Sequence, residues 1–464
     1  MRILFFLPCL LFARQGLAQY NADTVLTLAD ALRITEVNYP GIAAAQHIAA
    51  ASALEWKAAR QDGLPDLTVG IETAYGTIDG MNGLPAGEPG ITAITSGPVT
   101  ATPNWNAAFG ALYLSNIDWN LFSFGFQRAH VAAAKGQYEQ DRQALAQQIF
   151  QQQVRVAGAY LSLLAAQQVR VAMEDNLIRT LQLREVILAR TVNGLNPGVD
   201  SSIADAEVSK ARLSLLDAQN YEQMQATQLA IRMGVRLQHF QLDTGSASRL
   251  PEDPGGGVAA DLASNPNLRY LASQVMTSNL LGRYIQKSGL PRVSLFGVGQ
   301  ERGSGFGPDY GSNPADYSTA FFPGIQPYRA NYLLGVGVIW DITTLGRSRS
   351  RAAAQRERSS AFTEDYLLEQ NNLVNQLALA GEQIRNALAR YREAPVQLKA
   401  ASDAYRQKEA LYENGLANIV DVSQALYLLN RAEIDKDIAC NAVWQAFLLK
   451  TGTIGDLHPL LQQL

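Results

Sequence analysis

The sequence predicts a mainly α-helical protein with a smaller membrane β part, built from two tandem structural repeats. Three observations predict this fold class. Short phrases of sequence recur about 220 residues apart, and two segments alternate apolar and polar residues with the period of two that is typical of strands. Long stretches poor in proline follow these segments. The first of them, residues 128–192, would be almost 100 Å long as a helix, at about 1.5 Å per residue.

The N-terminal residues predict export. Arg2 precedes an apolar run, ILFFLPCLLFA, which has the length of a signal-peptide core. The small residues Gly16 and Ala18 stand where a signal peptidase would cleave, before Gln19. We therefore expect residues 1–18 to be a secretory signal.

Composition limits what the exported chain can be. Lipidation of Cys9 is an alternative, but the preceding Pro8 is not the small residue that lipidation requires. Beyond residue 18, Cys440 is the only cysteine, so no intrachain disulfide is expected. Without Arg2 and Arg14 the formal charge falls from −4 to −6, which argues against a nucleic-acid binder. No later stretch reaches the ~20 apolar residues of a transmembrane helix, so entry into a membrane would require strands.

The two halves of the chain repeat the same phrases in the same order. The matching pairs are GLPDLTVG (63–70) and GLPRVSLF (289–296), WNLFSFG (119–125) and WDITTLG (340–346), and NGLNPGVD (193–200) and NGLANIVD (414–421). The first pair is 226 positions apart, as are Pro40 and Pro266, and the other two are 221 apart. The change from an offset of 226 to one of 221 falls in loops rich in small and polar residues, where the length of the chain varies easily. We expect one repeat in residues 19–245 and the other in residues 246–464.

Each repeat has the same predicted elements. A helix comes first, at 27–61 with Thr27 as its N-cap and again at 261–287. A short strand, a polar loop and a second strand follow, and then a long helical hairpin with unequal arms. The predicted strands are about 67–76 and 105–122 in the first repeat and about 292–302 and 328–343 in the second, and the predicted hairpins are 128–232 and 347–450.

The second strand of each repeat has one apolar face. In the second repeat the alternate residues from Tyr328 to Ile342 are apolar, while Arg329, Asn331 and Asp341 lie between them. Such a pattern also fits a half-buried strand of a soluble sheet. Export and the aromatic residues at both ends favour a membrane strand. The side chains expected to face lipid are Tyr328, Tyr332, Leu334, Val336, Val338 and Trp340.

Alanines at heptad spacing predict close packing of the shorter hairpin arms, because small side chains let helices approach. Pro395 corresponds to Glu174 of the first repeat, so a local kink is predicted in the second long helix only. The alanines of the two arms are Ala204, Ala211 and Ala218, and, 221 positions later, Ala425, Ala432 and Ala439.

Four strands predict an oligomer. Every backbone polar group in hydrocarbon needs a partner, so membrane strands must close into a barrel. Two chains would give eight strands with a filled interior, and three would give twelve strands around an open lumen. A homotrimer is therefore the smallest assembly that makes a channel, with a trimeric α-helical barrel roughly 100 Å long continuing the 12-stranded β-barrel.

These features resemble the TolC family of outer-membrane efflux ducts. The resemblance rests on the duplicated order of elements, the LPDL and LPRV phrases, the W-x5-G strand exits and the G-L-x-x-x-V-D tips, and it covers nearly the whole mature chain. It implies a homotrimer in the outer membrane of a Gram-negative bacterium, in contact with lipid and with a long periplasmic extension. It also implies a passive exit duct of a tripartite efflux or type I secretion system, opened by a periplasmic adaptor (membrane fusion) protein and an inner-membrane pump of the RND, ABC or MFS type.

The two NGL phrases resemble the adaptor-docking turns of that family. Gly194 and Gly415 permit the chain to reverse, and Leu195 and Leu416 would stand exposed at the ends of the hairpins. The alternative is a plain helix turn with one buried leucine. The resemblance assigns docking to Asn193, Gly194, Leu195, Asn414, Gly415 and Leu416.

Asp421 has two compatible interpretations. As an N-cap with Gln424 three residues later it would form a capping box worth ~1 kcal/mol. The resemblance adds a ring of acids, one from each chain, that narrows the periplasmic mouth and attracts cations. Gln424 departs from the family pattern of a second acid, and Ala417 stands where some members carry a basic residue. We therefore expect a weaker gate at Asp421 and Gln424.

No enzymatic, metal or cofactor site is predicted. The four histidines lack metal-ligand spacing, and GVGQERG at 297–303 misses the dinucleotide fingerprint. The alternative function is a structural or adhesive trimeric coiled-coil protein with a β-barrel anchor, against which the duplicated tips argue. A diffusion porin would lack the long helices. Five arginines follow the second repeat's last strand, either as a solvated helix start or in contact with anionic groups at the membrane's inner face: Arg347, Arg349, Arg351, Arg356 and Arg358.

Overall fold

The computed structural model describes residues 25–80, 97–99, 102–237, 239–243, 245, 249–252 and 262–464. The expected signal at 1–18 and the alternative lipidation site at Cys9 lie outside these residues. The described residues fold as two compact units. Unit 1 holds residues up to Ala51, Glu139–Val275 and Ser360–Leu464, and unit 2 holds Ser52–Tyr138 and Met276–Ser359.

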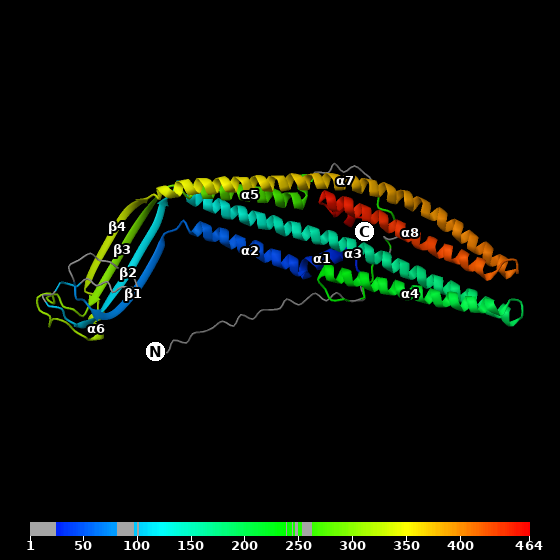
Figure 1. Ribbon diagram of the computed structural model, residues 1–464, viewed down its shortest axis with the longest axis horizontal. Helices are drawn as coiled ribbons and strands as arrows, with labels where there is room; N and C mark the ends of the chain where they lie inside the picture. Colours follow the sequence, from blue (N-terminus) through cyan, green and yellow to red (C-terminus); the bar gives the residue numbers. More distant parts are fainter. Residues whose placement is uncertain are drawn as a thin grey trace. The chain divides into compact units, whose positions relative to one another are not determined.

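Unit 2 contains one four-stranded antiparallel sheet in the order β1-β2-β3-β4 (Figure 1). Each repeat contributes two neighbouring strands, so the prediction of four strands per chain in two repeats is confirmed. Both outer strands, β1 and β4, have one edge that pairs with no described residue. The strands are β1 Asp66–Thr77, β2 Ala107–Phe122, β3 Arg292–Ser304 and β4 Arg329–Ile339.

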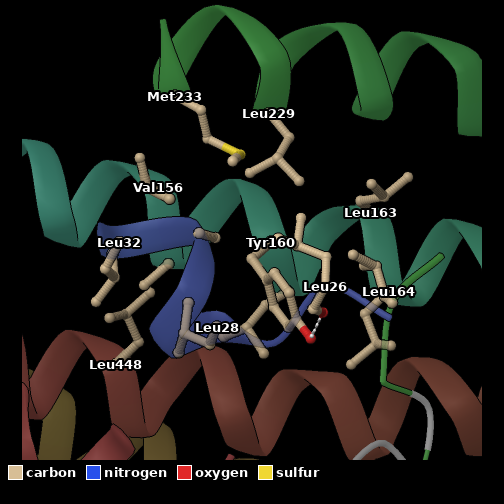
Figure 2. Packing of buried hydrophobic residues seen from close by; sticks show 14 of the residues in the cluster. Leu26, Leu28, Leu32, Val156, Tyr160, Leu163, Leu164, Leu229, Met233 and Leu448 are labelled. Carbon is tan, nitrogen blue, oxygen red and sulfur yellow. Dashed lines mark hydrogen bonds between the residues drawn. The ribbon is translucent and has the colours of Figure 1, made fainter. Parts of the chain in front are cut away.

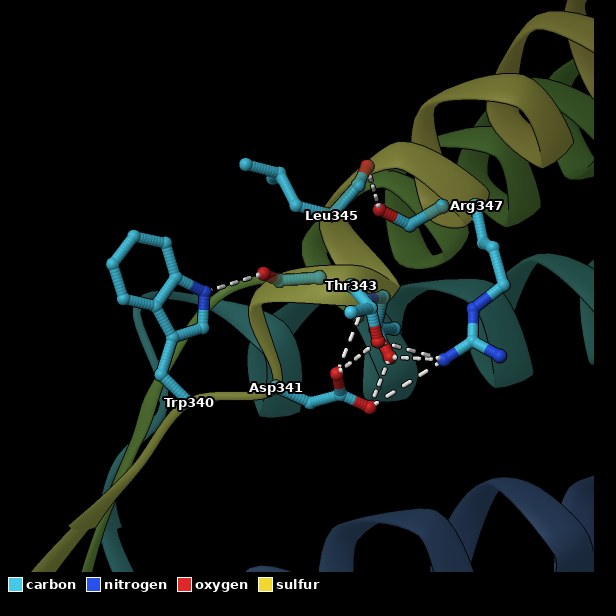
Figure 3. A network of polar contacts seen from close by, with 8 residues as sticks. Trp340, Asp341, Thr343, Leu345 and Arg347 are labelled. Carbon is cyan, nitrogen blue, oxygen red and sulfur yellow. Dashed lines mark hydrogen bonds and ion pairs between the residues drawn. The ribbon is translucent and has the colours of Figure 1, made fainter.

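The last strand is shorter than the predicted 328–343. The Asp341 carboxylate accepts a hydrogen bond from the Thr344 backbone N at 3.2 Å, which is how an N-cap satisfies the free donors of a helix start. Helix α7 therefore begins at Ile342. The Trp340 indole Nε1 donates to the Gly289 carbonyl at 3.2 Å (Figure 3), just as Trp119 donates to Gly63 at 3.1 Å in the first repeat.

The strand register gives the sheet one mainly apolar face and a second face that carries most of its polar residues. Paired residues place Leu67, Ile117, Gly297 and Leu334 in one row across the four strands. Because side chains alternate along a strand, every second residue joins this apolar face and the intervening ones join the other. The polar residues of the second face are Asp66, Thr68, Glu72, Asn116, Asp118, Asn120, Gln300, Arg302, Arg329 and Asn331. The same face also carries the apolar residues Leu112, Leu114, Phe296, Val298 and Leu333.

Unit 2 also holds parts of four helices. Thr277 of α5 donates to the Gly136 carbonyl of α3 at 2.9 Å, and Ser278 of α5 lies 2.8 Å from Ser359 of α7, oxygen to oxygen. Helix α5 therefore packs between α3 and α7 in this unit. These helices are α2 Pro40–Gln61, α3 Phe126–Val192, α5 Pro266–Lys287 and α7 Ile342–Glu413. The short helix α6, Phe321–Ile325, follows β3.

Unit 1 contains the main hydrophobic core (Figure 2). Tyr160 is 1% exposed and donates its hydroxyl to the Leu26 carbonyl at 3.0 Å. Thr27 caps α1, as predicted, by accepting from the Asp30 backbone N at 3.1 Å. The single predicted helix at 27–61 is two helices, because Pro40 disfavours the helical conformation of Tyr39. The further helices are α1 Leu28–Asn38, α4 Gly198–Met233, α8 Ile419–Ile454 and α9 His458–Leu461, with a 3-10 turn at Leu262–Ser264.

The shorter hairpin arms, α4 and α8, bury the alanines that sequence spacing singled out. All six are at most 8% exposed: Ala204, Ala211, Ala218, Ala425, Ala432 and Ala439. Pro395 lies inside α7, which stays helical through it, and the kink remains a prediction. Within the described residues, no helix combines the length and the apolar character that crossing a membrane needs.

Candidate functional site

Both long hairpins turn through the same backbone motif. In the first, Gly194 has φ 73° and donates to the Thr191 carbonyl at 3.0 Å, while Leu195 donates to Arg190 at 2.9 Å. In the second, Gly415 has φ 75° and the corresponding bonds end on Tyr412 and Leu411, at 3.0 and 2.8 Å. This is the Schellman arrangement, which satisfies carbonyls at a helix end and needs a left-handed residue. The NGL phrases thus end α3 and α7.

The predicted docking residues lie at these turns, and the two leucines are exposed. Leu195 is 67% exposed and Leu416 is 75% exposed, so the alternative of a buried turn leucine is wrong for the single chain. The preceding asparagines stabilise the helix ends. Asn193 and Asn414 each donate a side-chain amide hydrogen bond of 2.7 Å to the backbone carbonyl four residues earlier. Docking by these residues remains a prediction.

A polar cluster joins the two tips within unit 1. Arg190 donates through Nη1 to the Glu413 carbonyl at 2.6 Å and through Nε to Asn196 Oδ1 at 3.1 Å. Asn196 in turn donates to the hydroxyl of Tyr412 and to the carboxylate of Asp200. Burial, and then the nearby Asp200 charge, raise the pKa of Tyr412 above its ordinary value. No pattern in the sequence indicates this cluster, because its members are up to 223 positions apart.

The predicted N-cap at Asp421 is wrong. Helix α8 begins at Ile419, and its N-cap is Asn418, whose side chain accepts from the Asp421 backbone N at 2.9 Å. Asp421 therefore occupies the first turn, where a negative charge is favoured by the helix dipole. Its carboxylate accepts a hydrogen bond from Lys408 Nζ at 3.2 Å, across the turn from α7. Gln424 is exposed one turn further on and forms no capping box.

Of the residues predicted to face lipid, some lie in β4 and the others lie just before or after it. Four lie on the apolar face of β4 and are highly exposed in the single chain: Tyr332 85%, Leu334 71%, Val336 63% and Val338 70%. Tyr328 precedes β4, and Trp340 follows it. Among the described residues, no three His, Cys, Asp or Glu side chains gather as they would around a metal ion.

The fold defines a two-repeat protein in which each repeat contributes one long helical hairpin and two strands of a single four-stranded antiparallel sheet. Residues 32–235 and 261–446 match the family of outer membrane efflux proteins, and these ranges cover most of the chain. The chain therefore belongs to this family, the TolC family, whose members are non-enzymatic, homotrimeric channels of the Gram-negative outer membrane. Family membership contradicts the alternative of a structural or adhesive coiled-coil protein.

Solved structures of channels share this fold. The outer membrane protein VceC from Vibrio cholerae is 16% identical, with a TM-score of 0.70 over 92% of this chain and 96% of that one. The CmeC outer membrane channel from Campylobacter jejuni is 13% identical, with a TM-score of 0.73 over 92% and 85%. The open state of the MtrE outer membrane channel from Neisseria gonorrhoeae is 15% identical, with a TM-score of 0.70 over 92% and 89%. A search of the curated proteins finds no match.

Proposed function

We propose that this chain is the outer-membrane exit duct of a tripartite efflux or type I secretion system, opened by a periplasmic adaptor and an inner-membrane RND, ABC or MFS-type pump. Three copies would complete the channel. In a four-stranded antiparallel sheet β1 and β4 run in opposite directions, so β4 of one chain can pair antiparallel with β1 of the next. Threefold closure then leaves twelve strands and no unpaired edge in the membrane.

The apolar face of the sheet supports this arrangement. Leu67, Val69 and Ile71 of β1 are each about 70% exposed in the single chain, as are Leu334 and Val338 of β4. A barrel that turns this face outward buries it in lipid and lines the lumen with the second face, which carries most of the polar residues of the sheet. Trp119 and Trp340 then mark the periplasmic edge of the membrane, where tryptophan is favoured.

The adaptor would dock on the hairpin tips. The single observation that carries this proposal is that both tips present an exposed leucine, Leu195 or Leu416, on the same rigid turn. Exposed apolar groups on fixed backbone cost little ordering entropy when a partner covers them. Asn193, Gly194, Asn414 and Gly415 set the geometry, and the two leucines supply the contact.

The gate would be weak. Asp421 contributes one carboxylate per chain, and its ion pair with Lys408 offsets part of that charge. Gln424 is neutral and adds none. Three copies of Asp421 around the axis would still attract cations at low ionic strength, since opposite charges are only partly screened there.

Substitution of the tip leucines tests the docking proposal. Leu195→Asp combined with Leu416→Asp should abolish export of a pumped dye in cells that also carry the cognate adaptor and pump, while trimers still form. Leu213→Asp on α4 is the matched control, because Leu213 is 61% exposed but lies away from the turns. Export that survives the double substitution would place docking elsewhere.

A further inference from the structure

A groove between α5 and α7 in unit 2 is lined by arginines from both helices. Its volume is about 420 Å³. Buried Gly282, Ala352 and Ser359 line it, and the other side chains that line it are exposed. We call it the arginine groove and define it by Asn279, Gly282, Arg283, Gln286, Arg349 and Arg356. Only Arg349 and Arg356 belong to the run of five that the sequence singled out; Arg283 comes from the other helix.

The two helices that form the arginine groove carry few acids near it. Helix α5 contains no Asp or Glu, and α7 carries five arginines but only Glu357 between Ile342 and Ser359. Among the described residues, no carboxylate pairs with Arg283 or Arg349. Two or more guanidinium groups that share a groove repel one another, unless an anion lies between them.

The first repeat fills the corresponding position with a tryptophan. The repeat offset of 226 pairs Trp56 with Gly282 and Arg60 with Gln286, and the offset of 221 pairs Lys135 with Arg356. There the Arg60 guanidinium lies 6.0 Å from the Trp56 ring centroid and Lys135 Nζ lies 5.8 Å from it. Both cations of the first repeat therefore rest on an aromatic face, which is a favourable cation–π arrangement.

The second repeat keeps the positive charges and removes the aromatic ring. Besides Lys135 and Arg356, the offsets pair Arg128 with Arg349 and Lys57 with Arg283. Close packing does not require glycine at 282, because a Cβ there would meet only Gln355, at 3.6 Å, an ordinary van der Waals distance. The absence of a side chain at Gly282 thus leaves space beside the arginines. In the first repeat, Trp56 fills the corresponding space.

The arginine groove lies close to the membrane edge that the tryptophans mark. Arg349 is seven residues into α7, about 10 Å along the helix, and Arg283 is four residues from the end of α5, about 6 Å. The headgroup layer adds roughly 5–8 Å to each side of the hydrocarbon. Arg283 and Arg349 can therefore reach a phosphate at headgroup depth.

We propose that the arginine groove binds a phosphate group, either the phosphodiester of an anionic phospholipid in the inner leaflet or a free phosphate ion. Guanidinium groups recognise phosphate through paired, charge-assisted hydrogen bonds, and two from different helices fix its position. Asn279 and Gln286 offer further amide donors at the rim. This proposal depends on the outer-membrane location of the chain and not on adaptor docking. The export assay tests docking and the binding assay tests the groove, so a negative result in one does not imply a negative result in the other.

Native mass spectrometry of the detergent-solubilised protein tests the proposal. Added phosphatidylglycerol should remain bound to the wild-type protein, whereas phosphatidylcholine with the same acyl chains should bind more weakly, because its choline cation repels the arginines. Arg349→Gln should weaken phosphatidylglycerol binding about tenfold or more, since hydrogen bonds to charged groups contribute ~1.5–3 kcal/mol. Arg351→Gln is the matched control, because Arg351 lies two residues away on α7 outside the groove and loses the same charge.

Gly282→Trp gives a second, independent variant, because it copies the packing of the first repeat. It should also abolish binding, and the mass of the assembly in the same spectrum reports whether it folds. If millimolar inorganic phosphate displaces the lipid, the groove binds phosphate in general. If the lipid stays bound, the groove is specific for the lipid. Equal binding by the wild type, Arg349→Gln and Gly282→Trp would overturn the proposal, as would a wild-type protein that binds neither phosphatidylglycerol nor phosphate.

Discussion

Arg190, in the last turn of α3, donates a hydrogen bond of 2.6 Å from Nη1 to the backbone carbonyl of Glu413, the last residue of α7. The same guanidinium lies 5.5 Å from the ring centroid of Tyr412. A helix leaves its final carbonyls without intrahelical partners. A side chain of the first repeat thus satisfies a helix end of the second, and the two tips are coupled within one chain.

Removal of Arg190 should loosen both tips together. Arg190→Ala is expected to cost about 1 kcal/mol locally, because the arginine is half-buried and its charge-assisted bonds are partly screened. Hydrogen exchange of the amides at 190–196 and 412–418 should accelerate roughly fivefold. Arg212→Ala, an exposed arginine of α4, is the control and should leave both tips unchanged. Faster exchange at only one tip would contradict the coupling.

The tip glycines are required for their backbone conformation and not for space. A Cβ at Gly194 would meet no atom within 4 Å, yet the φ of this residue is positive, as is that of Gly415. Alanine at either position should destabilise the turn by ~1 kcal/mol, and asparagine should cost less. Gly381→Ala, inside α7 with open space around it, should instead stabilise the helix by a similar amount. Thermal unfolding that shifts in the same direction for all three alanine variants would contradict this account.

Asp421 and Lys408 should affect ion selectivity in opposite directions. In planar bilayers, Asp421→Asn should reduce the preference for cations, because the proposed ring loses its charge. Lys408→Gln should increase that preference, because it removes the cation that pairs with Asp421 at 3.2 Å. Reversal potentials in a KCl gradient measure both effects. Shifts of the same sign, or no shift in either variant, would show that these side chains lie away from the conduction path.

Cys440 should be unreactive in the native protein. Burial raises the pKa of its thiol to about 11, from an ordinary value of 9.0. Because the native state holds the proton more tightly, the stabilisation that this group contributes is complete below pH 9 and is lost as the pH rises toward 11. Labelling by a thiol reagent at pH 8 should be at least tenfold slower than in denaturant, since the thiolate is the nucleophile. Equal rates in the two states would show that Cys440 is accessible.

Local patterns in the sequence are enough to predict the repeats, the strands and the tip turns. A period of two identifies β4 because its alternate residues form one apolar face, and the positive φ of Gly194 follows from a glycine at a helix end. The N-cap of α8 is not predicted correctly, because two short polar residues, Asn418 and Asp421, compete for that position and the earlier one occupies it.

Contacts between distant segments could not be predicted. Arg190 and Glu413 are 223 positions apart, and no periodicity relates them. Part of the arginine groove can be predicted from the sequence, since the repeat offset alone pairs Trp56 with Gly282. That Arg283 and Arg349 line one groove depends on how α5 packs on α7, which a single sequence does not specify.

Electron cryomicroscopy of the purified protein in lipid nanodiscs tests the central claim most directly. The account predicts a threefold particle with twelve strands in the membrane, in which β4 of each chain pairs antiparallel with β1 of the next. A monomer, or a trimer in which the free edges of β1 and β4 stay unpaired, would contradict it.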